Sequence, residues 1–185
     1  GARIFSQVVP AAIARLPADL RARISITQQA RADDVDTVRK AYADMGVKAR
    51  VEPFLNDVPA LLRTAHLVIG RAGGSSVAEI TTAGRPCVLV PLPIAASDEQ
   101  TENARAITDA GAGWMIRQPD FTPQSLATRL QDLFTTPDDL ARAAAAAATL
   151  ARPDAALRLA DIVEECLQLS PSPAHPPSLE TETRT

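Results

Sequence analysis

The chain has 185 residues, of which 46% are hydrophobic and 22% charged, and its formal net charge is −3. This length is sufficient for one ordinary domain with its own core, and the composition is that of a soluble globular protein. The slight acidity and the aromatic content of 3% argue against nucleic acid as a partner, because there is neither a basic surface nor a platform for stacking bases. Cys87 and Cys166 lie far apart. They predict neither a disulfide framework nor a zinc site, which is consistent with a reducing cytoplasm.

Residues 1–16 read directly as an amphipathic helix, with Ile4, Val8, Ile13 and Leu16 roughly on one face. In an α/β domain such a helix normally follows a strand. We therefore expect the sequence to be a fragment cut between a first strand and its helix.

Apolar runs and amphipathic segments alternate along most of the remaining chain. Strands are predicted at residues 22–27, 48–54, 66–70, 87–92 and 114–118. Helices are predicted at residues 32–46, 56–65, 76–83, 98–111, 122–134, 137–151 and 153–169. The alternation predicts an α/β fold with a parallel sheet and helices on both faces, in which the apolar runs 66–70 and 87–92 are buried strands.

The last residues differ in composition from the rest of the chain. The segment "SPSPAHPPSLETETRT" is rich in Pro and Ser and shows no periodicity. Such a composition predicts disorder, so the chain is divided into a domain at residues 1–168 and a tail at 169–185.

Ligands of parallel α/β sheets bind beyond the carboxyl ends of the strands. Three loops lie there, at residues 54–57, 71–76 and 92–103. The second, "RAGGSS", combines glycines with the start of a helix, where free backbone N–H groups attract phosphate. Its spacing matches neither a dinucleotide fingerprint nor a Walker loop. Taken alone, the loop is explained equally well by a purely structural role.

Glu79 follows this loop and allows two interpretations. In the pattern "SVAE", the Ser76 hydroxyl and the Glu79 carboxylate would form a capping box at the start of the helix. A carboxylate in this place can instead accept hydrogen bonds from ribose hydroxyls, as in dinucleotide folds.

Gln100 and Asn103 close the third loop, which is long for a connection between a strand and a helix. Side-chain amides both donate and accept hydrogen bonds, so this pair suits sugar hydroxyls. The alternative is a solvated first turn that Asp98 caps. Neither His66 nor His175 has a partner in a known catalytic arrangement, and we predict no catalytic residue and no metal ligand in this chain.

Taken together, "VEPFLNDVPALLRTAHLVIGRAGGSSVAEITTAGRPCVLVPLP" and "DEQTENA" resemble the C-terminal half of the MurG family, from Gly1 to about Leu167. These are the UDP-N-acetylglucosamine–N-acetylmuramyl-(pentapeptide) pyrophosphoryl-undecaprenol N-acetylglucosamine transferases of peptidoglycan synthesis. The resemblance implies the C-terminal half of a GT-B enzyme, made of two Rossmann-like domains, with the first strand of this half missing. It also implies inverting transfer of GlcNAc from UDP-GlcNAc to lipid I, without a cofactor or a metal in the donor site.

Carried over by position, the resemblance implies a set of donor-binding residues. Phe54 would pack near uracil, the Leu55 backbone would contact its edge, Glu79 would accept the ribose hydroxyls, and Gln100 would contact GlcNAc. The full set of implied substrate-binding residues is Phe54, Leu55, Arg71, Gly73, Gly74, Ser75, Ser76, Glu79, Gln100 and Asn103. Of these, Arg71 and Gly73 would shape the diphosphate loop, and Ser76 would help to hold phosphate.

The sequence departs from the family pattern in two places. The glycine-rich "GGSQ" turn would precede or overlap Gly1, and Glu99 stands where many members have a His. The N-terminal domain, which binds lipid I, is absent from these residues. For the complete enzyme, the resemblance implies peripheral contact with the cytoplasmic face of the bacterial membrane and a role in cell wall biogenesis, cell shape and cell division.

Two other functional classes fit the same motifs. One is a different GT-B enzyme that acts on a UDP-sugar, either a glycosyltransferase or a UDP-GlcNAc epimerase. The other is a non-catalytic module that binds a nucleotide, which would show no preference for the attached sugar.

Overall fold

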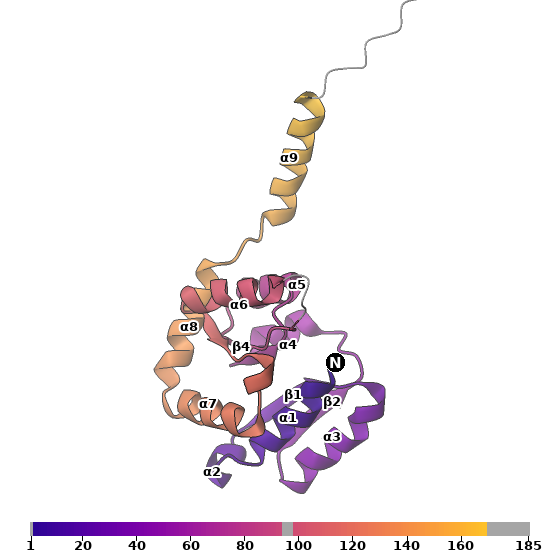
Figure 1. Ribbon diagram of the computed structural model, residues 1–185, viewed down its shortest axis with the longest axis vertical. Coiled ribbons are helices and arrows are strands. Elements are labelled where there is room, and N and C mark those ends of the chain that lie inside the picture. Colours follow the sequence, from indigo (N-terminus) through magenta and orange to yellow (C-terminus); the bar gives the residue numbers. More distant parts are fainter. Residues whose placement is uncertain (1, 94–97, 170–185) are drawn as a thin grey trace, which may run out of the picture. The chain divides into compact units, whose positions relative to one another are not determined.

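A computed structural model describes residues 2–93 and 98–169 of the protein (Figure 1). The chain divides into two compact units, residues 1–151 and residues 152–185, and each is described by itself. The helices of the first unit are α1 (Arg3–Ile13), α2 (Ala18–Arg21), α3 (Ala32–Asp44), α4 (Val58–Thr64), α5 (Gly74–Thr82), α6 (Glu99–Asp109), the 3-10 helix η1 (Gln118–Asp120), α7 (Pro123–Thr135) and α8 (Pro137–Thr149). Its strands are β1 (Ser25–Gln29), β2 (Lys48–Glu52), β3 (Val68–Gly70), β4 (Cys87–Leu89) and β5 (Gly113–Met115). The sequence predicted all of these except α2 and η1, which are too short to show a period.

All strand pairs are parallel, but the strands form two sheets. β1 pairs with β2, with Ser25 opposite Lys48, and a separate sheet has the order β3-β4-β5. The predicted parallel fold is confirmed, whereas the single continuous sheet is wrong for the described residues. Among the described strands, only β4 has a strand partner on both sides, and β1, β2, β3 and β5 each have one edge without a strand partner.

Helices cover both faces of the three-stranded sheet, as predicted. Alternate residues of its strands point to opposite faces, so Val88 and Cys87 belong to different cores. Val88 and Val90 pack in the core that includes α1, α3 and α7. Cys87 and Leu89 pack in the core built with α5, α6 and α8. Burial raises the pKa of the Cys87 thiol to about 12, so this cysteine remains an unreactive core residue.

β1 and β2 contribute to one of these cores only. Their buried face carries Gln28 and Val51, whereas Ser25, Thr27 and Arg50 are exposed. The Tyr42 hydroxyl of α3 donates to the Gln28 side-chain oxygen at 2.6 Å, and burial raises the pKa of this tyrosine. Among the described residues, helices therefore cover both faces of the β3-β4-β5 sheet, whose alternate residues pack in two different cores, but only one face of the β1-β2 sheet.

β3 is less buried than its apolar sequence predicts. All three of its residues are half-buried, whereas those of β4 are fully buried. The physical reason is the position of the strands: β4 has a partner on each side, and β3 has one on only one side.

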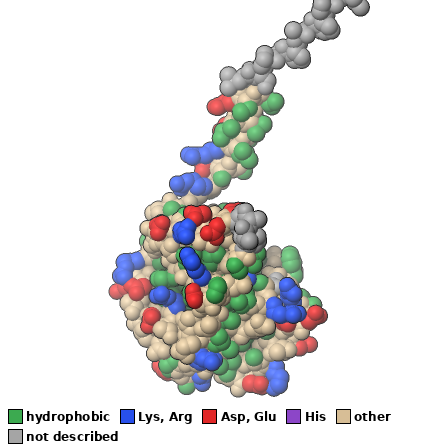
Figure 2. Space-filling view, viewed as in Figure 1, with side chains coloured by type: hydrophobic (Ala, Val, Ile, Leu, Met, Phe, Trp, Pro, Cys, Tyr) green, Lys and Arg blue, Asp and Glu red, His purple; other side chains and the backbone are tan. Residues whose placement is uncertain are grey.

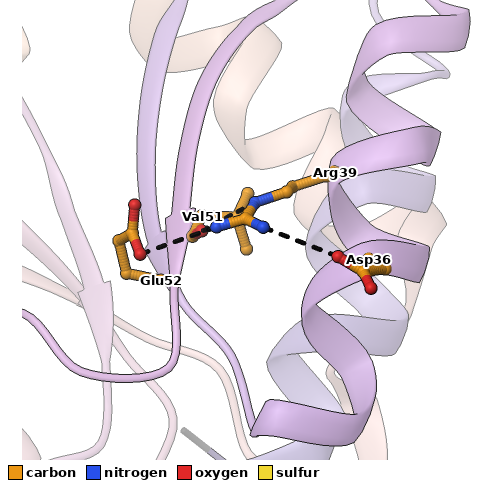
Figure 3. Close-up of polar contacts among 4 residues, drawn as sticks. All are labelled: Asp36, Arg39, Val51 and Glu52. Carbon is orange, nitrogen blue, oxygen red and sulfur yellow. Dashed lines mark hydrogen bonds and ion pairs between the residues drawn. The ribbon is translucent and has the colours of Figure 1, made fainter.

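The end of β2 is held against α3 by one arginine (Figure 3). Arg39 donates to the Val51 carbonyl oxygen from Nε at 3.0 Å and from Nη2 at 2.7 Å. Its guanidinium also forms ion pairs with Asp36 and Glu52, both at 3.5 Å. These contacts fix the strand immediately before the loop that carries Phe54.

The second unit contains helix α9 (Ala155–Leu169). Its large apolar side chains are exposed, and Figure 2 shows hydrophobic atoms along this helix. The exposed residues are Leu157, Leu159, Ile162, Val163 and Leu167. In the part of the chain that the structure describes, neither this helix nor any other combines the length and apolarity needed to span a membrane. The disordered tail was predicted at residues 169–185; Leu169 is the last residue of α9, and residues 170–185 lie outside the described residues.

Candidate functional site at the carboxyl ends of the strands

Helix α5 begins two residues earlier than predicted, which changes the role of Ser76. Gly73 is the N-cap residue, and its carbonyl oxygen accepts the first helical hydrogen bond, from the Val77 N–H at 3.0 Å. Ser76 is therefore the third residue of the helix and cannot cap it, so the capping box with Glu79 is wrong. The amides of Gly74, Ser75 and Ser76 precede the first helical bond, which leaves them available to an anion at the end of β3.

The packing of the protein does not explain the two glycines of this loop. A Cβ atom at Gly73 or Gly74 would meet no atom of the described residues within 4 Å. Neither residue has a positive φ, in contrast to Gly84, which ends α5 at φ 61° as predicted for a left-handed cap. The space in front of Gly73 and Gly74 is open, so a ligand can approach their backbone closely.

Glu79 lies in the second turn of α5, one turn after Ser76 and on the same side of the helix. It is exposed, and its carboxylate forms no hydrogen bond or ion pair with the described residues. A carboxylate with open hydrogen-bonding capacity beside free amides is suited to a neutral polyol that is joined to a phosphate.

Gln100 and Asn103 of α6 are tied to the two neighbouring loops. The Asn103 side-chain amide donates to the Ala72 carbonyl oxygen at 3.0 Å, immediately before Gly73. The Leu92 N–H donates to the Gln100 side-chain oxygen at 3.0 Å, which leaves the Gln100 NH₂ group as a donor. Asp98 occupies the N-cap position of α6 without a side-chain capping bond, so the predicted cap is wrong.

Arg71 joins the carboxyl ends of all three strands of its sheet. Its Nη1 atom donates to the carbonyl oxygens of Val90 at 3.1 Å and Pro91 at 3.2 Å, and its Nη2 atom donates to the Gln118 side-chain oxygen at 2.7 Å. The guanidinium also lies 5.4 Å from the centre of the Phe5 ring. Partial burial lowers the pKa of Arg71 through desolvation. This residue therefore holds protein groups together.

Phe54 and Leu55 lie on a separate loop after β2. The Phe54 side chain is 68% exposed, which is unusual for a phenylalanine and leaves a ring face open to a flat ligand. The loop is held by the Gln29 side chain, which donates to the Pro53 carbonyl oxygen at 3.2 Å, and by an ion pair between Arg50 and Asp57 at 3.1 Å.

The structure therefore brings together most of the predicted site residues at one edge. Hydrogen bonds link Arg71 and Gln100 to the segment after β4, and Asn103 to Ala72, the residue before Gly73. Glu79 follows on α5. Phe54 and Leu55 lie in the loop after β2, which belongs to the two-stranded sheet. Sequence reasoning missed Gln118 and Phe5, because neither lies in a motif and each meets Arg71 only through the fold.

Parallel strands that alternate with helices, with the start of α5 and several polar side chains at the carboxyl ends of β3 and β4, define a class of fold. The chain is a Rossmann-like domain of the kind that forms the C-terminal half of GT-B glycosyltransferases. The sequence profile of the glycosyltransferase family 28 C-terminal domain matches residues 1–159, and the chain belongs to this family.

Individual relatives support the same assignment. The chain is 56% identical over 168 residues to the UDP-N-acetylglucosamine–N-acetylmuramyl-(pentapeptide) pyrophosphoryl-undecaprenol N-acetylglucosamine transferase of Gluconobacter oxydans, which covers 91% of this chain and 46% of that protein. It is 56% identical over 173 residues to the transferase of the same name from Granulibacter bethesdensis, covering 94% and 45%.

Among solved structures, MurG of Acinetobacter baumannii matches with a TM-score of 0.79 and 31% identity, over 89% of this chain and 49% of that one. The chain thus spans about half the length of the relatives that it matches.

Proposed function

We propose that this chain binds UDP-GlcNAc and forms the donor half of an inverting transferase that moves GlcNAc to lipid I, producing lipid II in peptidoglycan synthesis. The proposal is supported by the names of the longer relatives, which are N-acetylglucosamine transferases with a UDP-linked donor and an undecaprenol-linked acceptor. It is carried by one observation in the chain itself, the start of α5 just after β3. Three amides there make no helical hydrogen bond, and the space beside Gly73 and Gly74 is open.

In this proposal each element of the site meets one part of the donor. The amides of Gly74, Ser75 and Ser76 receive the diphosphate, and the Glu79 carboxylate accepts the ribose hydroxyls. The Gln100 NH₂ group donates to the sugar, and the exposed Phe54 ring packs near the base. Such groups fix the donor by charge and by hydrogen bonds that water would otherwise make.

The helix start also has a chemical role in the proposed transfer. As the acceptor oxygen bonds to the anomeric carbon, the bond from that carbon to the diphosphate oxygen breaks, and UDP leaves with an additional negative charge. Preorganised amides at a helix N-terminus stabilise charge that develops in this way. The acceptor hydroxyl loses its proton to a group that we place outside these 185 residues.

The acceptor determines where the complete enzyme works. A polyprenol-linked substrate is anchored in the membrane, so we propose that the complete enzyme contacts the cytoplasmic face of the bacterial membrane peripherally, where it serves cell wall synthesis and, through it, cell shape and division. Binding of the complete enzyme to vesicles that contain the polyprenol-linked acceptor tests this placement. Equal recovery with and without vesicles in a flotation assay contradicts it.

Gly74→Ala tests the diphosphate part of the site. Because Cβ atoms of a helix tilt toward its N-terminus, the new methyl group would project toward the bound anion. We expect UDP affinity, measured by calorimetry, to fall about tenfold, which corresponds to roughly 1.4 kcal/mol. Stability should hold or rise, since alanine is the better helix former and the space is open.

Gly113→Ala is the matched control for this prediction. A Cβ atom at Gly113 would lie 2.5 Å from the Cys87 carbonyl oxygen, far too close for an atom within a sheet. This variant should lower the melting temperature through packing alone. A Gly74→Ala protein that loses stability and keeps its UDP affinity would contradict the proposed diphosphate site.

Gln100→Ala tests whether the site recognises the sugar. The variant should weaken UDP-GlcNAc more than UDP, because only the sugar nucleotide loses a donor. Gln100→Glu separates this role from the bond to Leu92, since it keeps an acceptor for that N–H and removes the NH₂ group. Equal losses for both ligands would place Gln100 at the nucleotide or in the fold, and normal discrimination in Gln100→Glu would assign it to the loop.

A further inference from the structure

The contacts of Arg71 exceed what a residue that only shapes one loop requires. Three acceptors from two other segments surround its guanidinium: Val90 and Pro91, which follow β4, and Gln118, which follows β5. With Arg71 itself immediately after β3, one side chain links the carboxyl ends of all three strands. We call Arg71, Val90, Pro91, Gln118 and Phe5 the Arg71 network.

The aromatic part of this network ties it to α1 and to the loop before α7. The Arg71 guanidinium lies over the Phe5 ring, and Phe5 meets Phe121 edge-on, with ring centres 5.5 Å apart and an interplanar angle of 64°. Phe121 is buried. A planar guanidinium can lie over a ring and donate to several acceptors at the same time, whereas a lysine presents a compact point charge.

The network leads directly to two groups of the proposed donor site. Pro91 precedes Leu92, whose N–H donates to Gln100, and Arg71 precedes Ala72, whose carbonyl oxygen accepts from Asn103. A shift of the Val90–Pro91 carbonyl groups relative to Arg71 would therefore change the distance between the loop after β3 and the loop after β4.

We propose that Arg71 is a positioning residue, which acts through Val90, Pro91 and Gln118 to set the spacing of the two loops that hold the diphosphate and the sugar. It does so without contacting the ligand. This inference rests on the proposed function for its ligand, whereas the effect on the loops can be measured without any ligand.

The chain offers a closely matched control in Arg85. This arginine donates to two backbone carbonyl oxygens, those of Arg63 and of Ala65, the latter at 3.2 Å. These groups precede β3, and Arg85 precedes β4, so the contact lies at the amino edge of the same sheet. Arg85→Lys thus removes the same kind of contact from the edge where no ligand is proposed.

The experiment compares Arg71→Lys, Gln118→Ala and Arg85→Lys in the 185-residue chain. UDP affinity is measured by calorimetry, the melting temperature by scanning calorimetry, and the exchange of the Leu92 amide by NMR without ligand. We expect UDP affinity to fall about tenfold in Arg71→Lys and severalfold in Gln118→Ala, within the range that residues acting through neighbours produce. The Leu92 amide should exchange faster in both. Arg85→Lys should lower the melting temperature and leave affinity and Leu92 exchange unchanged.

Three results would overturn the inference. If Gln118→Ala is like the wild type in affinity and exchange while Arg71→Lys loses affinity, Arg71 contacts the ligand directly. If Arg71→Lys lowers only the melting temperature, as Arg85→Lys does, its role is structural. If the wild type does not bind UDP, the proposed function fails, and unchanged Leu92 exchange in Arg71→Lys would then overturn the positioning role as well. In that case, faster exchange of the Leu92 amide in Arg71→Lys and Gln118→Ala, but not in Arg85→Lys, would still support the positioning role of Arg71.

Discussion

The 185-residue chain alone should transfer no measurable GlcNAc from UDP-GlcNAc to a lipid I analogue. Transfer requires the acceptor hydroxyl to be held against the anomeric carbon, and positioning of this kind supplies about 7–11 kcal/mol of the barrier reduction. The chain spans only about half the length of its relatives, and every group of the proposed site is assigned to the donor. A loss of this size puts the rate below that of the complete enzyme by many orders of magnitude.

The assay follows labelled GlcNAc into the lipid product, with the Gluconobacter oxydans relative as the complete enzyme. That protein is 56% identical to the chain over the shared region, so both should bind the same donor. As a control, binding of UDP-GlcNAc to the 185-residue chain is measured by calorimetry. If the donor binds, a lack of transfer reflects a missing acceptor site and not a loss of donor binding. Measurable transfer by the 185 residues would contradict the assignment of the acceptor and the proton-accepting group to the other half.

Glu79→Gln should reduce UDP affinity about 10- to 150-fold, because a hydrogen bond to a charged acceptor contributes roughly 1.5–3 kcal/mol. The melting temperature should stay within about a degree of the wild type. Glu79 lies beyond the first turn of α5 and has no partner among the described residues, so its charge contributes little to stability. Glu79→Gln is thus expected to lower UDP affinity and to leave the melting temperature nearly unchanged.

Ribose recognition is tested by a cycle of two proteins and two ligands. If Glu79 accepts the ribose hydroxyls, wild-type protein should prefer UDP over 2′-deoxy-UDP, and Glu79→Gln should largely remove that preference. Asp33→Asn, at an exposed carboxylate in the first turn of α3, controls for the change in net charge. An undiminished preference in Glu79→Gln would contradict the ribose assignment.

Sequence patterns predicted the elements well wherever the signal is local. Gly46 and Gly111 directly follow the C-cap residues of α3 and α6, and both have φ 70°, a conformation that glycine adopts without strain. The continuous apolar run around β4 predicted a strand that is buried on both faces, and Cys87, Val88 and Leu89 are at most 1% exposed. Hydrophobic periodicity and the residues that end a helix depend only on neighbours a few positions away in the chain. They can therefore be recognised in a single sequence.

The start of α5 shows where a local pattern predicts the wrong structure. "SVAE" matches a capping box, yet the helix begins at Gly74. Ala72 is fully buried and its carbonyl oxygen accepts from Asn103, 31 residues away, which holds the chain extended as far as Gly73. A contact with α6 therefore holds the chain before the first turn, and the amides of Gly74 to Ser76 stay open.

By itself, the sequence determined the alternation of strands and helices, the parallel pairing and the three loops that carry the candidate chemistry, because each follows from periodicity, glycine and residue type. Only the tertiary structure decided how these parts act on one another. The bonds of Arg71 to Val90 and Gln118 join residues 19 and 47 positions apart, and the division into β1-β2 and β3-β4-β5 depends on which strand edges meet. Contacts at such separations arise from packing of the whole domain, and no short pattern in the chain records them.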